Sequence, residues 1–589
     1  MKTGKYICLC AALLLLGAAA CTNLDEKVYS SVMSENYYQN KDDIIRAVFR
    51  PFEHVYCMTY ARARRGEIVS DQVITPTRGS WWYDAGKWEK YHRHQYDDIS
   101  ASTDWTGGWT DWYTGIGQCN LVLDDLGRLD PADFGLSREE FDAFVAQLRC
   151  MRAYCYFQLI DFYGDCILTT TADAAENEKP ENRTRRPRKE VFQFVESEFK
   201  DFCLQNLPMK VGSNGPGIHQ GEFTKGAAAA MLVKLYLNAE QWTGTPMYEE
   251  CIAMARRITG GEFGSYTLAE NWWEPFDWDN ENCNEVIFGF PASYGTTSWH
   301  MQNSSRTYYG RTLPYGCEQY LDIAGNGARN PQFALSPSFD NESPRQELPY
   351  RLGKVTRLFE KYPGDLRYKQ YKNLTNNSRE GMFFLEGKIP NKSTSTGWAR
   401  NPDNQYDLYL RDQVGLFLRT AEAGTIAAGY DKTSTMGNGD FNSGLYAVKY
   451  PFYSYTGGYY IESDYTDIRL AEVIYSEAEA LLRLGDATEA GRLLNSVRKR
   501  NYAEWTAGIA YEPEGIVQLD LDEMLDEWGR EFLEESHRRT DLIRFGRFQE
   551  AWWDKPADAD KHYELFPLSD EALFQNPYLT QNPGYEDPR

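Results

Sequence analysis

The fold is decided by residues 467–501, which read DIRLAEVIYSEAEALLRLGDATEAGRLLNSVRKRN. Apolar residues recur along the first half of this stretch at steps of three and four, which places them on one face of a helix. They are Ile468, Ala471, Tyr475, Ala478 and Leu482. Gly485 ends that helix. Asp486 begins a second one, and Glu489 is placed to complete its capping box. The stretch therefore predicts an antiparallel helix hairpin.

The second helix of this hairpin has its own apolar stripe, formed by Ala490, Leu493, Leu494 and Val497. Small residues at Ala471, Ala478 and Ala490 allow the two backbones to approach closely, as in tetratricopeptide-like repeats of about 34 residues. A single hairpin cannot bury its apolar faces, so other helix pairs must stack on it. We therefore expect a mainly α-helical, tetratricopeptide-like scaffold of helix pairs.

Residues 521–546 supply one neighbour for the hairpin, with an apolar stripe at Met524, Leu525, Trp528 and Phe532. The segment EFLEESHR at 531–538, followed by DLIRFG at 541–546, resembles the signature E-L-x-x-E-G-H-R and D-L-x-R-x-G of the SusD/RagB family. That family consists of outer-membrane nutrient-binding lipoproteins. Ser536 stands where the family has Gly. Near the end of the chain, LFPL at 565–568 and QNPGY at 581–585 resemble the closing motifs of the family.

The amino-terminal part repeats the helix-pair theme. Periodicity predicts helices over residues 42–60, 109–126, 139–163, 188–204, 223–242 and 247–259. Trp112, Tyr113 and Ile116 resemble the W-x-x-Y-x-x-I segment of the family, and DFYGD at 161–165 resembles its Tyr-Gly-Asp segment. The resemblance implies a SusD-like fold for the whole mature chain.

Between the two helical parts, residues 264–464 lose helical periodicity. Short β-like runs such as VIFGF at 286–290 are separated by Gly, Asn, Ser and Pro. We expect long irregular loops and small β-hairpins here, inserted into one globular unit. The chain then divides into a leader at 1–20, a helical part at 21–261, a loop-rich insertion at 262–464, and a helical part with a tail at 465–589.

The amino terminus reads as a secretory leader. Lys2 and Lys5 precede an apolar run that is too short to span a bilayer and that ends in AAAC at 18–21. These last residues resemble a bacterial lipobox, which implies that Cys21 is lipidated. Asp25 and Glu26 resemble the acidic signals that send such lipoproteins to the cell surface. We expect a protein on the outside of the outer membrane, held in the membrane through its amino-terminal lipid only.

Composition excludes some classes of function. The formal net charge is −24, so the chain should repel nucleic acid and anionic membrane surfaces. Beyond the leader and Cys21, the cysteines are odd in number and do not form a disulfide framework. Aromatic residues reach 15%, with 16 Trp and 41 Tyr, which favours some exposed rings used for binding.

Enzyme signatures are weak. The sequence has no Walker loop, no HExxH helix and no GxSxG elbow. Glu531, Glu535 and Asp541 are candidates for paired glycosidase carboxylates. However, Glu534 and Arg538 stand at helix-pairing distance, as do Glu535 and Arg539, which favours a solvated salt-bridged face. The acidic run DWDNE at 277–281 lacks the Gly and Glu of a calcium loop and indicates a solvated turn. His92 and His94 are interpreted as surface-loop residues, because no third metal ligand accompanies them. We predict no catalytic residues, no cofactor and no metal site.

Two aromatic segments are the candidate binding site. Sugars offer apolar C–H faces that stack on flat rings, and their hydroxyl groups bind polar side chains. The first segment lies in residues 74–102, a predicted long surface loop, and the second spans residues 294–309. The candidate ligand-binding residues are Arg78, Trp81, Trp82, Tyr83, Tyr294, Trp299, Asn303, Tyr308 and Tyr309. The alternative for these rings is that they attach the loops to the scaffold. We expect the two segments to converge in one shallow, solvent-facing site.

The family resemblance implies a non-catalytic cell-surface protein that captures an oligosaccharide or polysaccharide and delivers it to a TonB-dependent SusC-like transporter. Two alternatives remain open. One is a RagB-like lipoprotein that binds oligopeptides, and the other is a secreted all-helical glycoside hydrolase. The sugar, its linkage and any role of calcium are not encoded in these motifs.

Overall fold

The computed structural model describes residues 37–96, 103–209, 221–292, 308–321, 331–375, 378–392, 397–401, 406–417, 431–453 and 462–589. The leader and Cys21 lie outside these ranges, as do the candidate site residues Tyr294, Trp299 and Asn303. Within the described ranges, no helix is both long and apolar enough to cross a membrane.

The predicted hairpin is present as α16 (Leu470–Arg483) and α17 (Ala487–Arg498). Ala471, Ala478 and Ala490 are fully buried where the hairpin packs, which confirms the role of the small residues. A further neighbour, α18 (Leu521–Glu531), packs on α16 and is followed by α19 (Arg538–Arg544).

The cap of α17 is formed by half of the predicted capping box. The Asp486 side chain accepts a hydrogen bond from the Glu489 amide at 3.0 Å. The reciprocal bond is not formed, because the Asp486 amide donates to the carbonyl oxygen of Leu481 at 2.9 Å. The Glu489 carboxylate pairs with Arg492 instead.

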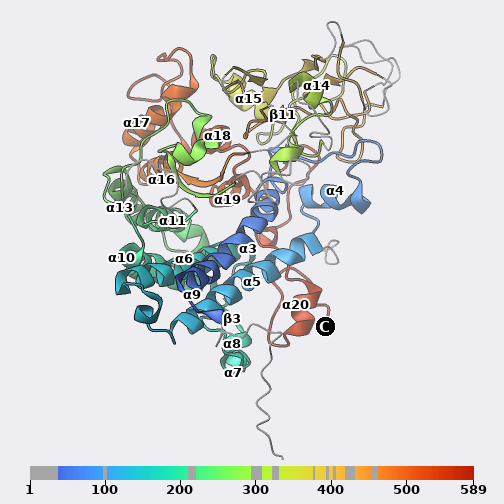
Figure 1. Ribbon diagram of the computed structural model, residues 1–589. Helices are drawn as coiled ribbons and strands as arrows, with labels where there is room; N and C mark the ends of the chain where they lie inside the picture. The colour runs from blue at the N-terminus through green and yellow to red at the C-terminus, as the bar shows by residue number, and fades with distance from the viewer. Residues whose placement is uncertain are drawn as a thin grey trace, which may run out of the picture.

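Helices of the amino-terminal part stack on this hairpin. The long ones are α3 (Lys41–Glu67), α5 (Thr103–Leu126), α6 (Arg138–Tyr163), α9 (Arg188–Ser197), α11 (Lys225–Leu237) and α13 (Tyr248–Thr259). α11 and α13 pack on α16, and α3 and α5 pack on α6. Figure 1 shows α13, α16 and α17 along one side of the molecule, with α3 and α5 crossing its middle. The helix-pair scaffold predicted from the sequence is therefore confirmed.

The other helical segments are short. They are α4 (Lys87–His92), α7 (Ala174–Asn177), α8 (Pro180–Arg183), α10 (Leu204–Asn206), α12 (Ala239–Thr243), α14 (Cys317–Leu321), α15 (Val355–Glu360) and α20 (Asp570–Gln575). The predicted helix over residues 188–204 runs from α9 through a π-helical turn (Glu198–Cys203) into α10.

Small two-stranded antiparallel sheets are present, as predicted, and each described sheet except the one in residues 166–186 includes a strand of the loop-rich region. The longest joins β4 (Val286–Phe290) to β12 (Tyr465–Arg469), which leads directly into α16. The others pair β1 (Val73–Ile74) with β5 (Ala334–Leu335), β2 (Cys166–Ile167) with β3 (Arg185–Arg186), β6 (Lys372–Asn373) with β7 (Arg379–Glu380), β8 (Phe383–Phe384) with β11 (Tyr446–Ala447), and β9 (Gly387–Lys388) with β10 (Tyr409–Leu410).

Residues 74–96 are only in part the surface loop that the sequence indicated, because residues 79–87 are exposed or half-buried while most of the others are buried. They contain α4, and both His92 and His94 are buried, at 0% and 1% exposure. The His94 ring bonds to Asp558 at 2.8 Å and to the carbonyl oxygen of Val69 at 2.9 Å. The interpretation of these histidines as surface residues is therefore wrong. They attach the segment to the carboxy-terminal part of the chain.

Candidate functional site

The signature segment, residues 531–546, forms a turn between two helices. α18 ends at Glu531 and α19 begins at Arg538. Ser536 adopts a left-handed φ of 67°, the conformation that favours Gly. Gly66, near the end of α3, approaches the turn so closely that a Cβ atom would lie 2.6 Å from the carbonyl oxygen of Ser536. The turn at Ser536 therefore packs directly against the backbone of α3.

Charged side chains of the signature segment are buried. The Glu531 carboxylate binds Arg469 at 2.9 Å, Arg500 at 3.0 Å and Arg367 at 2.8 Å. Burial by itself would raise the pKa of Glu531, but these guanidinium groups hold it well below its usual range. Arg367 also pairs with Asp365 at 2.7 Å. This network joins the insertion to the helical scaffold.

The prediction of a solvated salt-bridged face is therefore wrong. Because α18 ends before Glu534, the expected helical pairs with Arg538 and Arg539 do not form. Arg538 binds Asp71 at 2.6 Å instead, and Glu535 binds Arg469 at 2.8 Å and a buried Lys449 at 2.7 Å. Glu531 and Glu535 thus each form an ion pair with an arginine, and Asp541 pairs with Arg544 at 2.8 Å. The carboxylates that a glycoside hydrolase would need for catalysis are therefore occupied in ion pairs.

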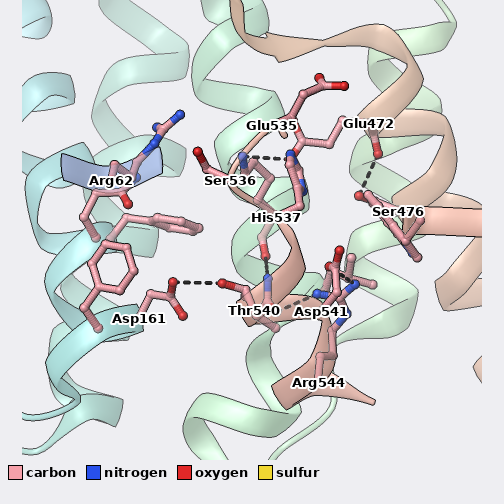
Figure 2. A pocket seen from close by; sticks show the side chains of 17 residues that line it. Arg62, Asp161, Glu472, Ser476, Glu535, Ser536, His537, Thr540, Asp541 and Arg544 are labelled. Carbon is pink, nitrogen blue, oxygen red and sulfur yellow. Dashed lines mark hydrogen bonds and ion pairs between the residues drawn. The ribbon is translucent and has the colours of Figure 1, made fainter. Parts of the chain in front are cut away.

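A polar pocket lies beside the signature segment (Figure 2). It is lined by side chains of α3, α6, α11 and α16 together with His537, Thr540 and Asp541. Figure 2 shows Asp161 facing Thr540, and the two side chains are joined by a hydrogen bond of 2.9 Å. The cavity measures about 60 Å³, whereas small-molecule pockets start at roughly 300 Å³. It therefore has room for a few water molecules but not for a sugar.

The acidic run at 277–281 is also partly internal. Asp277 and Asn280 are buried, and the Asn280 amide donates to the carbonyl oxygens of Pro275 and Asp464, both at 2.9 Å. The prediction of a solvated turn is wrong here, because Asn280 satisfies backbone groups beside β12. Among the described residues, no group of three or more His, Cys, Asp or Glu side chains is arranged to hold a metal ion.

Three of the predicted site residues are buried. Arg78 is 0% exposed, Tyr308 1% and Tyr309 3%. The Tyr309 hydroxyl donates to the carbonyl oxygen of Glu534 at 2.9 Å, and the Tyr308 ring stacks on Phe333. The expectation that these side chains face solvent is wrong. Ring density along a sequence does not separate binding rings from rings that attach a loop to the core.

Arg78 holds several loops together. Its guanidinium group donates to the carbonyl oxygens of Pro76, Pro331, Gln332 and Ser443 at 3.3–3.4 Å. Its backbone exchanges two hydrogen bonds with Trp81, of 3.0 and 3.1 Å. These bonds form a tight turn, in which Gly79 has a φ of 64°. Arg78 thus positions Trp81 without facing solvent.

The turn that follows Trp81 carries backbone strain. Trp82, Asp84 and Ala85 have φ angles of 62°, 41° and 56°, which cost on the order of 1 kcal/mol or more each for residues other than Gly. The Trp88 indole donates to Asp84 at 2.6 Å, and the Arg311 guanidinium lies 5.3 Å from the Trp82 ring centre. Strain of this kind clusters at functional sites. Here it leaves the Tyr83 side chain 61% exposed.

Trp81 belongs to a group of three half-buried rings, which we call the aromatic triad: Trp81, Tyr315 and Phe441. The ring centroids of Trp81 and Phe441 are 5.5 Å apart, those of Trp81 and Tyr315 6.3 Å, and those of Tyr315 and Phe441 5.6 Å. All three pairs are edge-to-face. Three loops thus meet in one place. Figure 1 shows α4 and α14, which flank these loops, at the end of the molecule away from α13 and α10.

The triad differs in membership from the predicted site. Trp81, Trp82 and Tyr83 lie at or beside it, while Tyr315 and Phe441 were not identified from the sequence. Each of these two is a single ring in a short loop, in the segments PYGC at 314–317 and DFNSG at 440–444. No periodicity marks them, and the contacts that unite them with Trp81 are formed only in the folded chain.

Comparisons with known proteins agree with this fold. Residues 23–237 match a family model described as starch-binding associating with outer membrane, and residues 418–585 match the model of the SusD family. The starch-binding protein SusD of Bacteroides thetaiotaomicron is 25% identical over 502 residues, which cover 81% of this chain and 79% of that protein.

Solved structures give the same result. A SusD superfamily protein from Parabacteroides distasonis superposes with a TM-score of 0.63 at 16% identity, covering 94% of this chain and 100% of that one. A laminarin-binding SusD-like protein superposes with a TM-score of 0.55 at 19% identity, covering 93% of this chain and 100% of that one. At these identities the likeness concerns the fold.

Proposed function

Because the chain belongs to the SusD/RagB family, whose members are non-catalytic binding proteins, we propose that it captures a glycan at the surface of the outer membrane. The glycan is then delivered to a TonB-dependent SusC-like transporter. The observation that carries the glycan proposal is the aromatic triad, in which rings from three separate loops are held half-exposed beside the exposed ring of Tyr83.

The triad suits a sugar for chemical reasons. A pyranose ring presents C–H groups on its faces, and these pack on aromatic rings while the hydroxyl groups stay at the edge. Each stacked ring contributes on the order of 1 kcal/mol. Affinity is then spread over several side chains, which is typical of an open, solvent-facing site rather than an enclosed pocket.

The ligand class is supported by the relatives. One of them is a starch-binding protein, and one solved structure is of a laminarin-binding protein. Both ligands are glucans. Tyr294, Trp299 and Asn303 remain part of the proposed site as predictions, since they precede Tyr308 in a segment rich in rings. Trp82, whose ring lies against the Arg311 guanidinium group, is placed at the edge of the proposed site.

The anchor and the partner complete the proposal. Cys21, at the end of the leader, carries the lipid, and one family model bears an outer-membrane description. The lipid tethers only the amino terminus of the chain, so the contact with the transporter positions the binding protein over the pore. Copurification of a TonB-dependent barrel from mild detergent extracts tests this part. Recovery of the lipoprotein alone, without crosslinks to a barrel, contradicts it.

Affinity electrophoresis tests the binding function. The wild-type protein is run through gels that contain starch, laminarin or other polysaccharides, beside Tyr315→Ala and the control Phe574→Ala. Phe574 lies on α20 and is 62% exposed, so it is a ring whose removal should disturb the core little. We expect a polysaccharide to retard the wild type and the control more than Tyr315→Ala. Retardation by none of them, with binding of oligopeptides instead, would establish the peptide alternative.

A further inference from the structure

The π-helical segment Glu198–Cys203 is held firmly against the middle of α6. Figure 1 shows α9 and α10, which flank this segment in the chain, beside α6. The Glu198 carboxylate binds two arginines of α6, Arg149 at 3.1 Å and Arg152 at 3.0 Å. These bonds fix the segment in register with the turn of α6 that carries both arginines.

A pair of cysteines lies at this contact. Cys150 of α6 and Cys203 of the π-helical segment are both 0% exposed. The Cys203 thiol donates to the carbonyl oxygen of Ala146 at 3.9 Å, and in an α-helix that oxygen accepts the amide of the residue four positions on, which is Cys150. The two thiols are also in hydrogen-bond contact with each other. The two sulfur atoms therefore meet where the segment packs on α6.

The compartment of the protein decides what this pair can become. The leader at residues 1–20 predicts export, and exported chains meet an oxidising environment in which disulfides form and persist. In the folded protein, burial and then the neighbouring Cys203 thiol raise the pKa of the Cys150 thiol, whereas only a thiolate reacts. A bond between the two sulfur atoms would thus form while the chain folds, and the closed core would then shield it from reductants.

We propose that Cys150 and Cys203 form a disulfide bond in the exported protein, which goes beyond its proposed function. The two thiols lose two protons and two electrons as the S–S bond forms. The electrons reduce the disulfide of a thiol–disulfide oxidoreductase to a dithiol, through a mixed disulfide with one of the two cysteines. The bond restricts the unfolded chain by closing a loop between residues 150 and 203. The other seven cysteines after Cys21 stay thiols, so the chain still lacks a disulfide framework.

Alkylation of the exported protein tests the bond. Cells that express the full chain are quenched in acid, which stops thiol exchange, and the protein is unfolded and treated with N-ethylmaleimide. We expect seven of the nine cysteines after Cys21 to be alkylated. After digestion with trypsin, which cuts after Arg and Lys, residues 150–152 should appear joined to residues 201–210. The mass of this linked peptide should be two hydrogen atoms below the sum of its parts.

Controls separate a specific bond from an accidental one. Cys119 of α5 is the matched control, because it is also buried and acts on the Cys150 thiol through its charge. Cys119→Ala should keep the linked peptide, whereas Cys150→Ala should lose it and be alkylated at all eight remaining cysteines. Dithiothreitol should leave the linked peptide intact in the folded protein and cleave it once the protein is unfolded. A chain made without its leader in a reducing cytoplasm should be alkylated at all nine.

Four results would overturn the inference. They are alkylation of all nine cysteines in the exported wild type, a linked peptide that contains Cys119 in place of Cys203, a linked peptide from the leaderless chain as well, and cleavage by dithiothreitol in the folded protein. The wild-type peptide map needs no variant, so the test stays decisive even if Cys150→Ala fails to fold. None of these results bears on glycan binding, which is tested separately.

Discussion

The ring of Trp81 stands edge-on to the ring of Phe441, with 5.5 Å between the centroids and an interplanar angle of 82°. One residue follows α3 and the other precedes β11, so the contact joins the amino-terminal part to the loop-rich region. Edge-to-face pairs are favourable beyond the area they bury. The pair is nevertheless left half-exposed, which is the arrangement expected of a surface that binds a ligand rather than of a core.

Arg78→Ala tests the positioning role of Arg78. The substitution leaves four carbonyl oxygens without their buried donor, so we expect a loss of about 3 kcal/mol in the free energy of unfolding. Urea denaturation measures this loss. Tyr83→Ala, at a side chain that is 61% exposed, should change stability little. A variant Arg78→Ala of normal stability that no longer binds glycan would make Arg78 a ligand contact instead.

Glu523→Gln should change how stability depends on acid. Burial would raise the pKa of Glu523, but Arg530 and Lys361 hold it at about 2. A carboxyl group with a lowered pKa stabilises the fold above its unfolded pKa, and that stability is lost as the pH falls towards 2. We expect the variant to be about 3 kcal/mol less stable at pH 7. The difference from wild type should shrink between about pH 4.5 and pH 2; a constant difference would contradict the assignment.

Glu67→Gln should act in the opposite direction. Burial raises the pKa of Glu67 from 4.5 to about 8, and its Oε2 has no hydrogen-bond partner among the described residues. The folded state therefore keeps a proton that the unfolded chain loses, and stability falls as the pH rises through 8. Gln mimics the protonated acid and keeps the oxygen that accepts the Ser536 amide at 2.6 Å.

We expect Glu67→Gln to match the wild type near pH 4.5 and to be about 4 kcal/mol more stable at pH 9. Thermal melts across this range check the prediction. A variant that is less stable than the wild type at pH 9 would show that the folded protein favours the ionised form of Glu67, so that the pKa of this group is not raised.

Cys21→Ala tests the anchor. Without the thiol, no lipid can be attached, so we expect the protein to move from the membrane fraction into soluble fractions. Fractionation and surface labelling of intact cells provide the measurement. If Cys21→Ala stays with the membranes and remains labelled on intact cells, the anchor lies elsewhere.

The scaffold could be predicted because its signal is local. Residues 467–501 carry apolar side chains at helical spacing and a small residue wherever two backbones meet, and the structure places α16 and α17 there. The pairing of VIFGF at 286–290 with β12 had no such signal. The partner of a strand depends on contacts between distant parts of the chain, so only the strand at 286–290 could be predicted and not its pairing.

Charges were the main source of error. Glu531 and Arg538 were assigned to a solvated face, because residues 534 and 538, and 535 and 539, have the spacing of ion pairs on a helix. In the folded chain, they bind Arg469 and Asp71, which lie far away in the sequence. A turn at Ser536, rather than a continuous helix, directs them inward. Burial of this kind depends on distant partners, which helical spacing within one segment does not reveal.

The binding site that we propose overlaps in part with the residues predicted from the sequence. Trp81 and Tyr83 could be identified because a cluster of rings beside Gly has no helical period. Tyr315 and Phe441 could not, since each stands alone in its loop. Tyr308 resembled them in sequence but stacks on Phe333 at a centroid distance of 4.5 Å, which makes it part of the core.

Calorimetric titration of Trp81→Ala tests the central claim most directly, with the polysaccharide that retards the wild type in the gel screen. We predict that Trp81→Ala weakens binding at least about fivefold, that Phe574→Ala binds as the wild type does, and that both variants melt within a few degrees of it. A Trp81→Ala variant that retains full affinity but melts far below the wild type would contradict the account, because Trp81 would then serve only to attach its loop.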